Sequence, residues 1–230
     1  MSEILKFNRL KAAEASGGIS NNVIYSMFER ILIQIDAKGD ILDFGAGAGN
    51  LTKRLQKMQR FSAITAADLL GRPPGISEQI EWLNCDLNDK IAAPDKSFDV
   101  IISAEVIEHL ENPRALMREW SRMLRPGGKL VFSTPNNESW RSLLALLWRG
   151  HFVVFGDTCY PAHITALLRK DIERILKETA FSAPKFIFTN VGRFPKFPQL
   201  TWQSISFGFL KGLRFSDNLM VISQKPEACE

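Results

Sequence analysis

Cysteine, histidine and tyrosine are scarce in this chain of 230 residues, which contains three cysteines, three histidines and two tyrosines. The cysteines (Cys85, Cys159 and Cys229) are odd in number and lack metal-ligand spacing, which disfavours a disulfide framework or a zinc site. They indicate reduced thiols, and we expect a cytoplasmic protein. No apolar run approaches the roughly 20 residues that span a bilayer. The first residues lack the apolar stretch of a signal peptide, so secretion is not expected.

Apolar residues, by contrast, are plentiful, at 45% of the chain, which argues against disorder and fits one domain with a sizeable core. Strand-like and helix-like segments alternate from Asp40 to Phe188, and this pattern predicts a mostly parallel sheet covered on both faces. The expected strands are 41–44, 62–68, 81–83, 98–103, 124–135, 185–190 and 219–224. The expected helices are 21–35, 51–58, 112–124 and 168–179.

The most informative segment is Asp40-Ile-Leu-Asp-Phe-Gly-Ala-Gly-Ala-Gly-Asn50. A short apolar strand runs into glycines at 45, 47 and 49, and a helix is expected next. Glycine permits positive φ and lets a ligand lie against the backbone. The segment therefore predicts a nucleotide-binding corner.

A second predicted strand ends at Asp68, 23 residues after Gly45. An acid at this position can accept the hydroxyl protons of a ribose. A G-x-G-x-x-G dinucleotide site would need glycine where the chain has Asn50. Neither Tyr25 nor Tyr160 stands four residues before a lysine, which disfavours many short-chain dehydrogenases.

Five ordered motifs identify a family resemblance: ILDFGAGAGN, AADL, NCDL, FDVIISAEVIEHL and LRPGGKLVFSTPN. Across about residues 20–190 the chain resembles a class I S-adenosylmethionine (SAM)-dependent methyltransferase, of the group with small-molecule, lipid and glycan acceptors that includes the ubiquinone-pathway O-methyltransferases. The resemblance implies a Rossmann-like, doubly wound α/β fold. Its sheet would have seven strands, mostly parallel, with an antiparallel last strand.

The resemblance also implies where SAM binds, at the carboxyl ends of the strands. The glycines would cradle the amino-acid part of SAM, and Asp68 would bind its ribose. Asp86 would face the adenine amino group, and Ala104 or Glu105 would lie beside the methionyl part. The residues expected to bind the cofactor are Asp43, Gly45, Ala46, Gly47, Gly49, Asp68, Leu69, Cys85, Asp86, Leu87, Ala104 and Glu105.

The run Glu105-Val-Ile-Glu108-His109 resembles the metal-binding E-x-x-E-H of the ubiquinone-pathway enzymes and of small-RNA 3′-terminal 2′-O-methyltransferases. On a helix, positions 105, 108 and 109 would share one face. A divalent cation could bind there, with His163 as fourth ligand. The alternative is that one acid contacts the cofactor and His109 packs beside the sheet.

Histidines are the candidate catalytic groups, because a hydroxyl acceptor usually needs a base. His163 and His109 are the expected ones, and His151 is a weaker candidate. His163 precedes a predicted helix that Thr165 could cap, so a structural role is an equal alternative.

Positive charge gathers in residues 141–215, with 11 Lys and Arg against 4 Asp and Glu. We expect a basic, aromatic lid at 136–165 and an insert at 191–217 that covers the acceptor pocket, within a single domain 1–230. The basic and aromatic residues fit an ordinary basic face beside a lid, or contact with lipid or a membrane surface. Nucleic acid is not an expected partner, since no Arg-rich tract is present.

The sequence thus predicts a SAM-dependent methyltransferase that acts on an oxygen of a small-molecule, glycan- or lipid-linked acceptor. One alternative is a metal-assisted O-methyltransferase acting on a polyprenyl-phenol or an RNA 3′ end. The other is a non-catalytic, cofactor-binding partner subunit.

Overall fold

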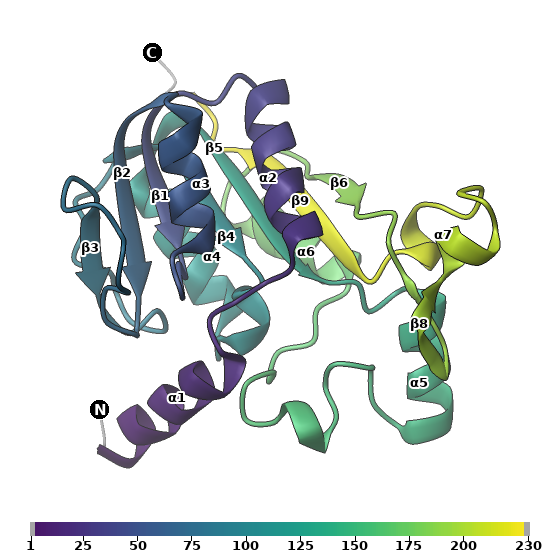
Figure 1. Ribbon diagram of the computed structural model, residues 1–230. Helices are drawn as coiled ribbons and strands as arrows, with labels where there is room; N and C mark the ends of the chain where they lie inside the picture. The colour runs from purple at the N-terminus through teal and green to yellow at the C-terminus, as the bar shows by residue number, and fades with distance from the viewer. Residues whose placement is uncertain (1–2, 228–230) are drawn as a thin grey trace.

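A seven-stranded sheet forms the centre of the protein in the computed structural model, which describes residues 3–227 (Figure 1). Its strand order is β3-β2-β1-β4-β5-β9-β6. The pairs among β1 to β5 are parallel, whereas β9 is antiparallel to both β5 and β6. The bounds are β1 Gly39–Phe44, β2 Phe61–Asp68, β3 Glu81–Asn84, β4 Phe98–Ala104, β5 Leu124–Pro135, β6 Lys185–Phe188 and β9 Asn218–Gln224.

Helices cover both faces of this sheet because successive strand residues point to opposite faces. Ile41 packs with α2 and α3, and its neighbour Leu42 packs with α4 and α6. Trp120 of α4 is fully buried against Phe44 and Phe132. These helices are α2 Asn22–Gln34, α3 Asn50–Met58, α4 Pro113–Met123 and α6 Arg169–Glu178.

The predicted α/β fold is confirmed, including the antiparallel last strand, and the helix and strand bounds agree to within a few residues. Three features were not predicted. They are α1 Glu3–Ser16, α5 Trp140–Arg149 in the 136–165 segment, and a small unit in the 191–217 insert made of the hairpin β7 Arg193–Phe194 and β8 Phe197–Thr201 with α7 Trp202–Ile205.

The unpredicted elements lie at the edges of the central sheet (Figure 1). Helix α1 lies at the lower left of the view, below the ends of β2 and β3, and α5 lies beside β8 and α7 at the right. Within residues 3–227, none of the helices combines the length and the apolar character needed to cross a membrane.

Candidate functional site

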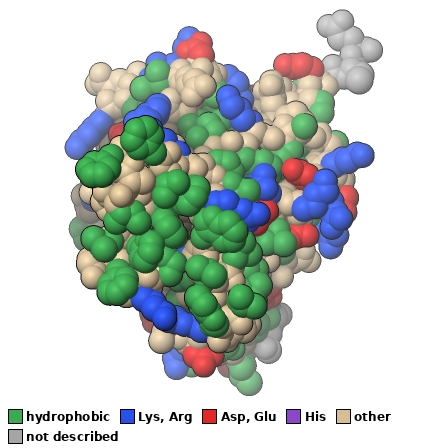
Figure 2. All heavy atoms as spheres, turned by 90° about the vertical axis from the view of Figure 1, so that its right-hand side faces the viewer, with side chains coloured by type: hydrophobic (Ala, Val, Ile, Leu, Met, Phe, Trp, Pro, Cys, Tyr) green, Lys and Arg blue, Asp and Glu red, His purple; other side chains and the backbone are tan. Residues whose placement is uncertain are grey.

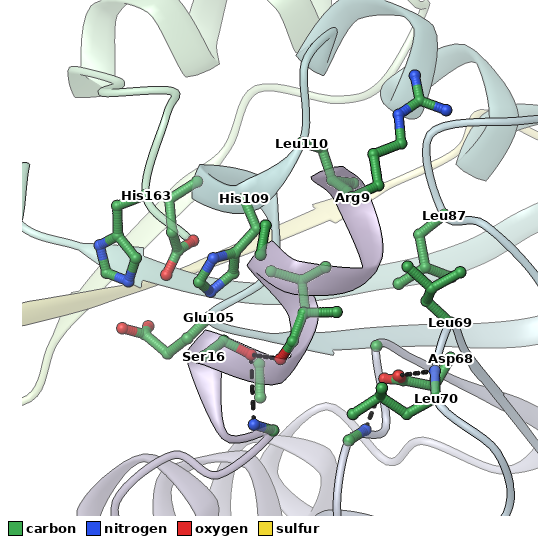
Figure 3. A pocket seen from close by; sticks show the side chains of 18 of the residues that line it. Arg9, Ser16, Asp68, Leu69, Leu70, Leu87, Glu105, His109, Leu110 and His163 are labelled. Carbon is green, nitrogen blue, oxygen red and sulfur yellow. Dashed lines mark hydrogen bonds between the residues drawn. The ribbon is translucent and has the colours of Figure 1, made fainter. Parts of the chain in front are cut away.

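A cavity of about 690 Å³ lies at the carboxyl ends of β1, β2 and β4, where an open parallel sheet usually binds its ligand (Figure 3). Its floor includes the glycine turn after β1, and α1 forms part of the opposite wall. Ten of the twelve residues predicted to bind the cofactor line it; Gly49 and Cys85 do not.

The glycine turn adopts the positive φ that the sequence predicts, with φ of 82° at Gly45 and 51° at Gly47. The close approach at these glycines, however, is to the protein itself. A Cβ on Gly47 would lie 2.3 Å from the carbonyl oxygen of Gly18, and a Cβ on Gly45 would lie 2.2 Å from Val106. Gly18 also accepts a hydrogen bond from the Ala48 amide at 2.9 Å. The loop after α1 therefore packs directly on the turn.

Asp68 ends β2 and is buried, with its carboxylate at the cavity edge (Figure 3). One carboxylate oxygen accepts from the Gly47 amide at 2.7 Å and the other from the Leu70 amide at 2.8 Å. Burial raises the pKa of Asp68, and the two amides counter that shift. The carboxylate thus ties the glycine turn to the end of β2, and each oxygen keeps a further lone pair for a hydroxyl donor.

Asp86 lies at the same edge, but its oxygens have protein partners. Arg9 of α1 donates to one of them at 2.9 Å, and the Asn88 amide donates to the other at 3.0 Å. Arg9 also pairs with Glu111 at 2.7 Å and with Asp89 at 3.4 Å. These ion pairs hold α1 across the cavity, and the contact expected between Asp86 and adenine stays a prediction.

Asp43 lies deeper, in β1, and is 1% exposed. The Thr52 hydroxyl donates to it at 2.6 Å, while burial raises the pKa of Asp43 to about 7. Asp43 lines the cavity but also serves to join β1 to α3.

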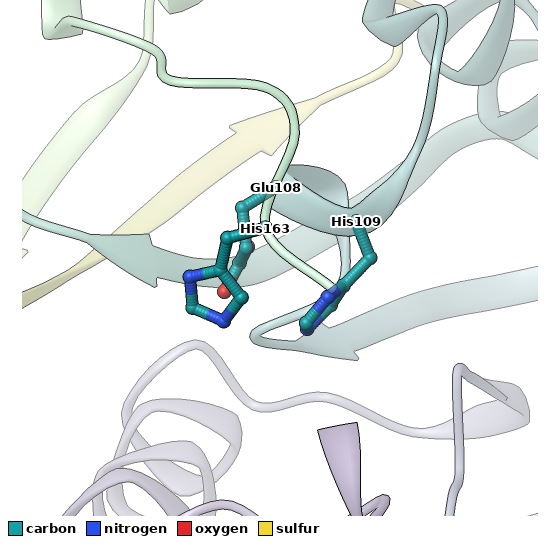
Figure 4. A group of neighbouring side chains, drawn as sticks. All are labelled: Glu108, His109 and His163. Atoms are coloured by element: carbon teal, nitrogen blue, oxygen red, sulfur yellow. The ribbon is translucent and has the colours of Figure 1, made fainter. Parts of the chain in front are cut away.

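The prediction that Glu105, Glu108 and His109 share a helix face is wrong. Glu105 has a φ of +57°, and only Ile107–His109 forms a turn of 3-10 helix. The fold nevertheless gathers most of the predicted group. Ligand atoms of Glu108, His109 and His163 all lie within 4.8 Å of one another (Figure 4). Glu105 is not part of this compact set, although its charge helps to raise the pKa of Glu108, and one of its oxygens accepts from Asn218 at 2.6 Å.

Burial controls the charges of this group. It raises the pKa of Glu108 and Glu105 and lowers that of His109. It lowers the pKa of His163 to about 4, with a further contribution from nearby His109. Both imidazoles are therefore neutral at physiological pH. His109 places Nδ1 at 2.7 Å from the Ala162 carbonyl, which can only accept, so Nδ1 carries the proton and Nε2 keeps a lone pair.

Within the set Glu108, His109 and His163, two buried atoms find no hydrogen-bond partner among the described residues, Glu108 Oε1 and His163 Nδ1. Buried polar atoms are normally hydrogen-bonded or bound to a ligand or ion. A carboxylate and two neutral imidazoles make a donor set that a divalent transition metal accepts. The residues therefore fit the predicted cation, with Glu105 outside the compact set.

The proposed cap at Thr165 is wrong. The Thr165 hydroxyl donates to the Leu110 carbonyl at 2.6 Å, and Asp171 instead accepts from the amide of Leu168, the residue before α6.

His163 lies against His109, with ring centroids 4.7 Å apart, and lines the cavity. His151 lies outside the cavity lining, with Nδ1 at 2.9 Å from the carbonyl of Phe152.

Sequence reasoning missed the residues that α1 brings to the site, including Arg9, Ala12 and Ser16. No motif marks this helix. The only signal was an isolated arginine whose three acidic partners lie 77 to 102 residues away.

Comparison with known proteins agrees with the fold and the motifs. Residues 21–183 match the methyltransferase domain family. A ubiquinone biosynthesis O-methyltransferase of Xanthomonas oryzae pv. oryzae is 32% identical over 146 residues, which cover 56% of this chain and 60% of that protein. The chain thus matches about 60% of that curated relative's length.

Two solved structures share the fold over nearly the whole chain. A SAM-dependent methyltransferase from Archaeoglobus fulgidus has a TM-score of 0.63 and 16% identity, covering 97% of this chain and all of that one. The N-methyltransferase NodS from Bradyrhizobium japonicum, solved with S-adenosyl-L-homocysteine, has a TM-score of 0.60 and 20% identity, covering 96% of this chain and all of that one. With its family match over residues 21–183 and its ordered motifs, this chain belongs to the methyltransferase domain family.

Proposed function

We propose that this protein transfers the methyl group of SAM to an oxygen of a small-molecule, glycan- or lipid-linked acceptor. The observation that carries the proposal is the 690 Å³ cavity, which brings together the glycine turn, Asp68 and the histidine pair at the carboxyl edge of the sheet. When bound, SAM supplies an electrophilic methyl group on a positively charged sulfur, so the protein's main task is to align a nucleophile and exclude water.

The residues divide this task by position. Gly45 and Gly47 would bind the amino-acid part of SAM, and Asp68 would bind the ribose hydroxyls. Leu69 and Leu87 would pack on the faces of the adenine base. His163 is neutral above about pH 4, so its lone pair is available to take the proton of an attacking hydroxyl. His109 is a second acceptor through Nε2, because the Ala162 carbonyl holds its Nδ1 proton.

Calorimetry with S-adenosylhomocysteine tests the cofactor site, and transfer of a labelled methyl group from SAM tests the reaction. We expect saturable binding of one molecule per chain. A purified protein that releases no heat with either compound would contradict the proposal. Binding without methyl transfer to any acceptor class would instead favour the non-catalytic partner subunit.

A metal-assisted reaction is the second candidate, favoured by the unpartnered atoms of Glu108 and His163. A bound cation would hold the acceptor oxygen and favour its alkoxide. We expect a chelator to reduce methyl transfer at least tenfold and added Mg²⁺, Mn²⁺ or Zn²⁺ to restore it, with S-adenosylhomocysteine affinity unchanged. Full turnover in chelator would leave the histidines as the base without a metal.

We also propose that the protein contacts an anionic membrane surface through its insert. Phe207 and Phe209 are 92% and 87% exposed, and Trp148 of α5 is 68% exposed. Lys196 lies over the Trp148 ring at 5.8 Å, which joins the insert to α5. Figure 2 shows apolar side chains with basic ones among them on this side of the molecule. Apolar residues interleaved with Lys and Arg are typical of interfacial anchors. Such contact would make the protein peripheral to a membrane and otherwise cytoplasmic.

A further inference from the structure

A second cavity, of about 340 Å³, adjoins the first and is lined by Asn21, Glu105 and His163 in common with it. It lies beyond the carboxyl end of β5, between α5 and the ends of β6 and β9. Because Glu105 and His163 line both cavities, a group bound in this chamber would meet the first cavity beside His163, the proposed base.

Twelve of the seventeen residues that line this chamber are polar or charged. They come from five separate parts of the chain: the loop before α2, the end of β4, the β5–α5 region, the segment between α5 and α6 that contains His163, and the ends of β6 and β9 with the insert.

Three lining residues each carry a buried polar atom that has no hydrogen-bond partner within residues 3–227: Glu105 Oε1, Asn137 Oδ1 and His163 Nδ1. Asn137 is only 2% exposed, and its amide nitrogen already donates to the Leu167 carbonyl at 3.0 Å. The oxygens of Glu105 and Asn137 are hydrogen-bond acceptors that need a donor. A ligand that enters the chamber with hydroxyl groups would supply one.

Arg141 adds hydrogen-bond donors to the acceptor oxygens of this chamber. One of its guanidinium nitrogens lies 3.4 Å from Asp217, and this is the single polar contact found for its side chain among the described residues. A guanidinium has five N–H donors, so several are available to acceptor oxygens. Burial lowers the pKa of Arg141 and raises that of Asp217, as expected for a pair shielded from water.

We infer that this chamber binds a polyhydroxylated acceptor, a sugar ring, through several hydroxyls at once; the inference rests on the proposed function. A hydroxyl both donates and accepts, so adjacent ring hydroxyls match acceptor atoms on Glu105 and Asn137 beside the donors of Arg141. An alkyl phenol offers one hydroxyl and would leave the remaining buried atoms unpaired. The chamber thus selects the glycan class among the proposed acceptors.

The reaction balances with SAM as the methyl donor. The sugar oxygen forms a bond to the methyl carbon, and the bond from that carbon to sulfur breaks with its electrons going to sulfur. The hydroxyl proton passes to His163, the lining residue whose unpartnered nitrogen is at the junction.

Saturation-transfer NMR tests the inference with the full chain in the presence of S-adenosylhomocysteine. The probes are methyl glycosides of hexoses, 6-deoxyhexoses and hexuronic acids, compared with alkylated phenols and catechols. We expect transfer to at least one glycoside and not to the phenols. Binding of phenols without any glycoside would overturn the inference, as would no glycoside binding at all.

Arg141→Met and Asn137→Leu should each weaken glycoside binding at least tenfold while leaving S-adenosylhomocysteine affinity unchanged. Arg149→Met is the matched control, since Arg149 lies on the same helix, is exposed and is outside the chamber lining. If Asn137→Leu fails to fold, Arg141→Met decides alone. Glycoside binding that Arg141→Met leaves unchanged would contradict the inference. If the unmodified protein does not bind S-adenosylhomocysteine, the proposed function fails, and this outcome is distinct from failure of the inference.

Discussion

The carboxyl group of Asp68 has two roles that a single substitution removes together. It accepts hydrogen bonds from the amides of Gly47 and Leu70, and it stands at the cavity edge where a ribose hydroxyl would bind. The hydrogen bonds to the two amides are present in the fold, whereas ribose binding is proposed.

Asp68→Ala should weaken S-adenosylhomocysteine binding tenfold or more, equivalent to about 1.4 kcal/mol. Asp68→Asn should have a smaller effect because its amide oxygen still accepts one bond. Glu178→Ala, at an exposed acid on α6, is the control. Calorimetry provides the affinities, and equal values for Asp68→Ala and the unmodified protein would remove the ribose assignment.

Asp43 makes stability depend on pH. Its pKa is about 7 in the fold, against 3.8 as its ordinary value. Between these values the unfolded carboxyl has lost its proton while the folded one keeps it. Unfolding therefore releases a proton, and the free energy of unfolding falls as pH rises from about 4 to 7, by up to about 1.4 kcal/mol per pH unit from this group.

Asp43→Asn should flatten that slope, because the amide does not ionise and its oxygen still accepts from Thr52. Urea unfolding of the cofactor-free protein at pH 5 and pH 7.5 measures the change. Asp157→Asn, at an exposed site, should leave the slope as it is. A slope that Asp43→Asn does not reduce would show that Asp43 ionises normally in the folded protein.

Among the elements, α1 shows the limit of sequence reasoning most clearly. The glycine turn, the strand-end acids and the histidines were predicted because local patterns encode strand, turn and helix. Helix α1 has no such pattern, and its place depends on Arg9 meeting acids far along the chain. The same limit applies at Glu105, where a backbone turn replaced the expected helix, and at Thr165, whose hydroxyl found a distant carbonyl.

Arg9→Gln should loosen α1 without unfolding the sheet. The Arg9 side chain is 12% exposed and pairs with three acids, so we expect a loss of about 1–2 kcal/mol in local stability. Hydrogen exchange of the α1 amides should accelerate about tenfold or more, with exchange in β1 and β4 unchanged. Arg114→Gln, which breaks an exposed pair with Glu178, is the control. Unchanged exchange in α1 would mean that apolar contacts alone hold the helix.

For the whole molecule, the segments that carry positive charge and aromatic residues were predictable from the sequence. The exposure of their side chains and the contacts between these segments were not. Composition marked residues 141–215 as basic, and the sequence marked 191–217 as an aromatic insert. The fold adds that Phe207 and Phe209 point outward and that the insert meets α5. Side-chain exposure depends on tertiary packing, which periodicity over such a short irregular segment does not determine.

Replacing both Phe207 and Phe209 with Ser should reduce co-sedimentation with anionic phosphatidylglycerol vesicles at least fivefold. Neutral phosphatidylcholine vesicles should bind the unmodified protein weakly, because the nearby basic residues gain nothing from them. Ile4→Ser, another exposed apolar position on the distant helix α1, is the control. Recovery of the unmodified protein in the supernatant with both vesicle types would contradict membrane contact.

The contact between Gly18 and Gly47 links the start of the chain to the donor pocket. A shortened protein that begins at Ser20 would lose the carbonyl that the Ala48 amide binds, along with the segment resting on the turn. Trimming the N-terminus for expression or crystallisation would therefore reshape the binding floor itself, and affinities measured on such a fragment would describe a different pocket.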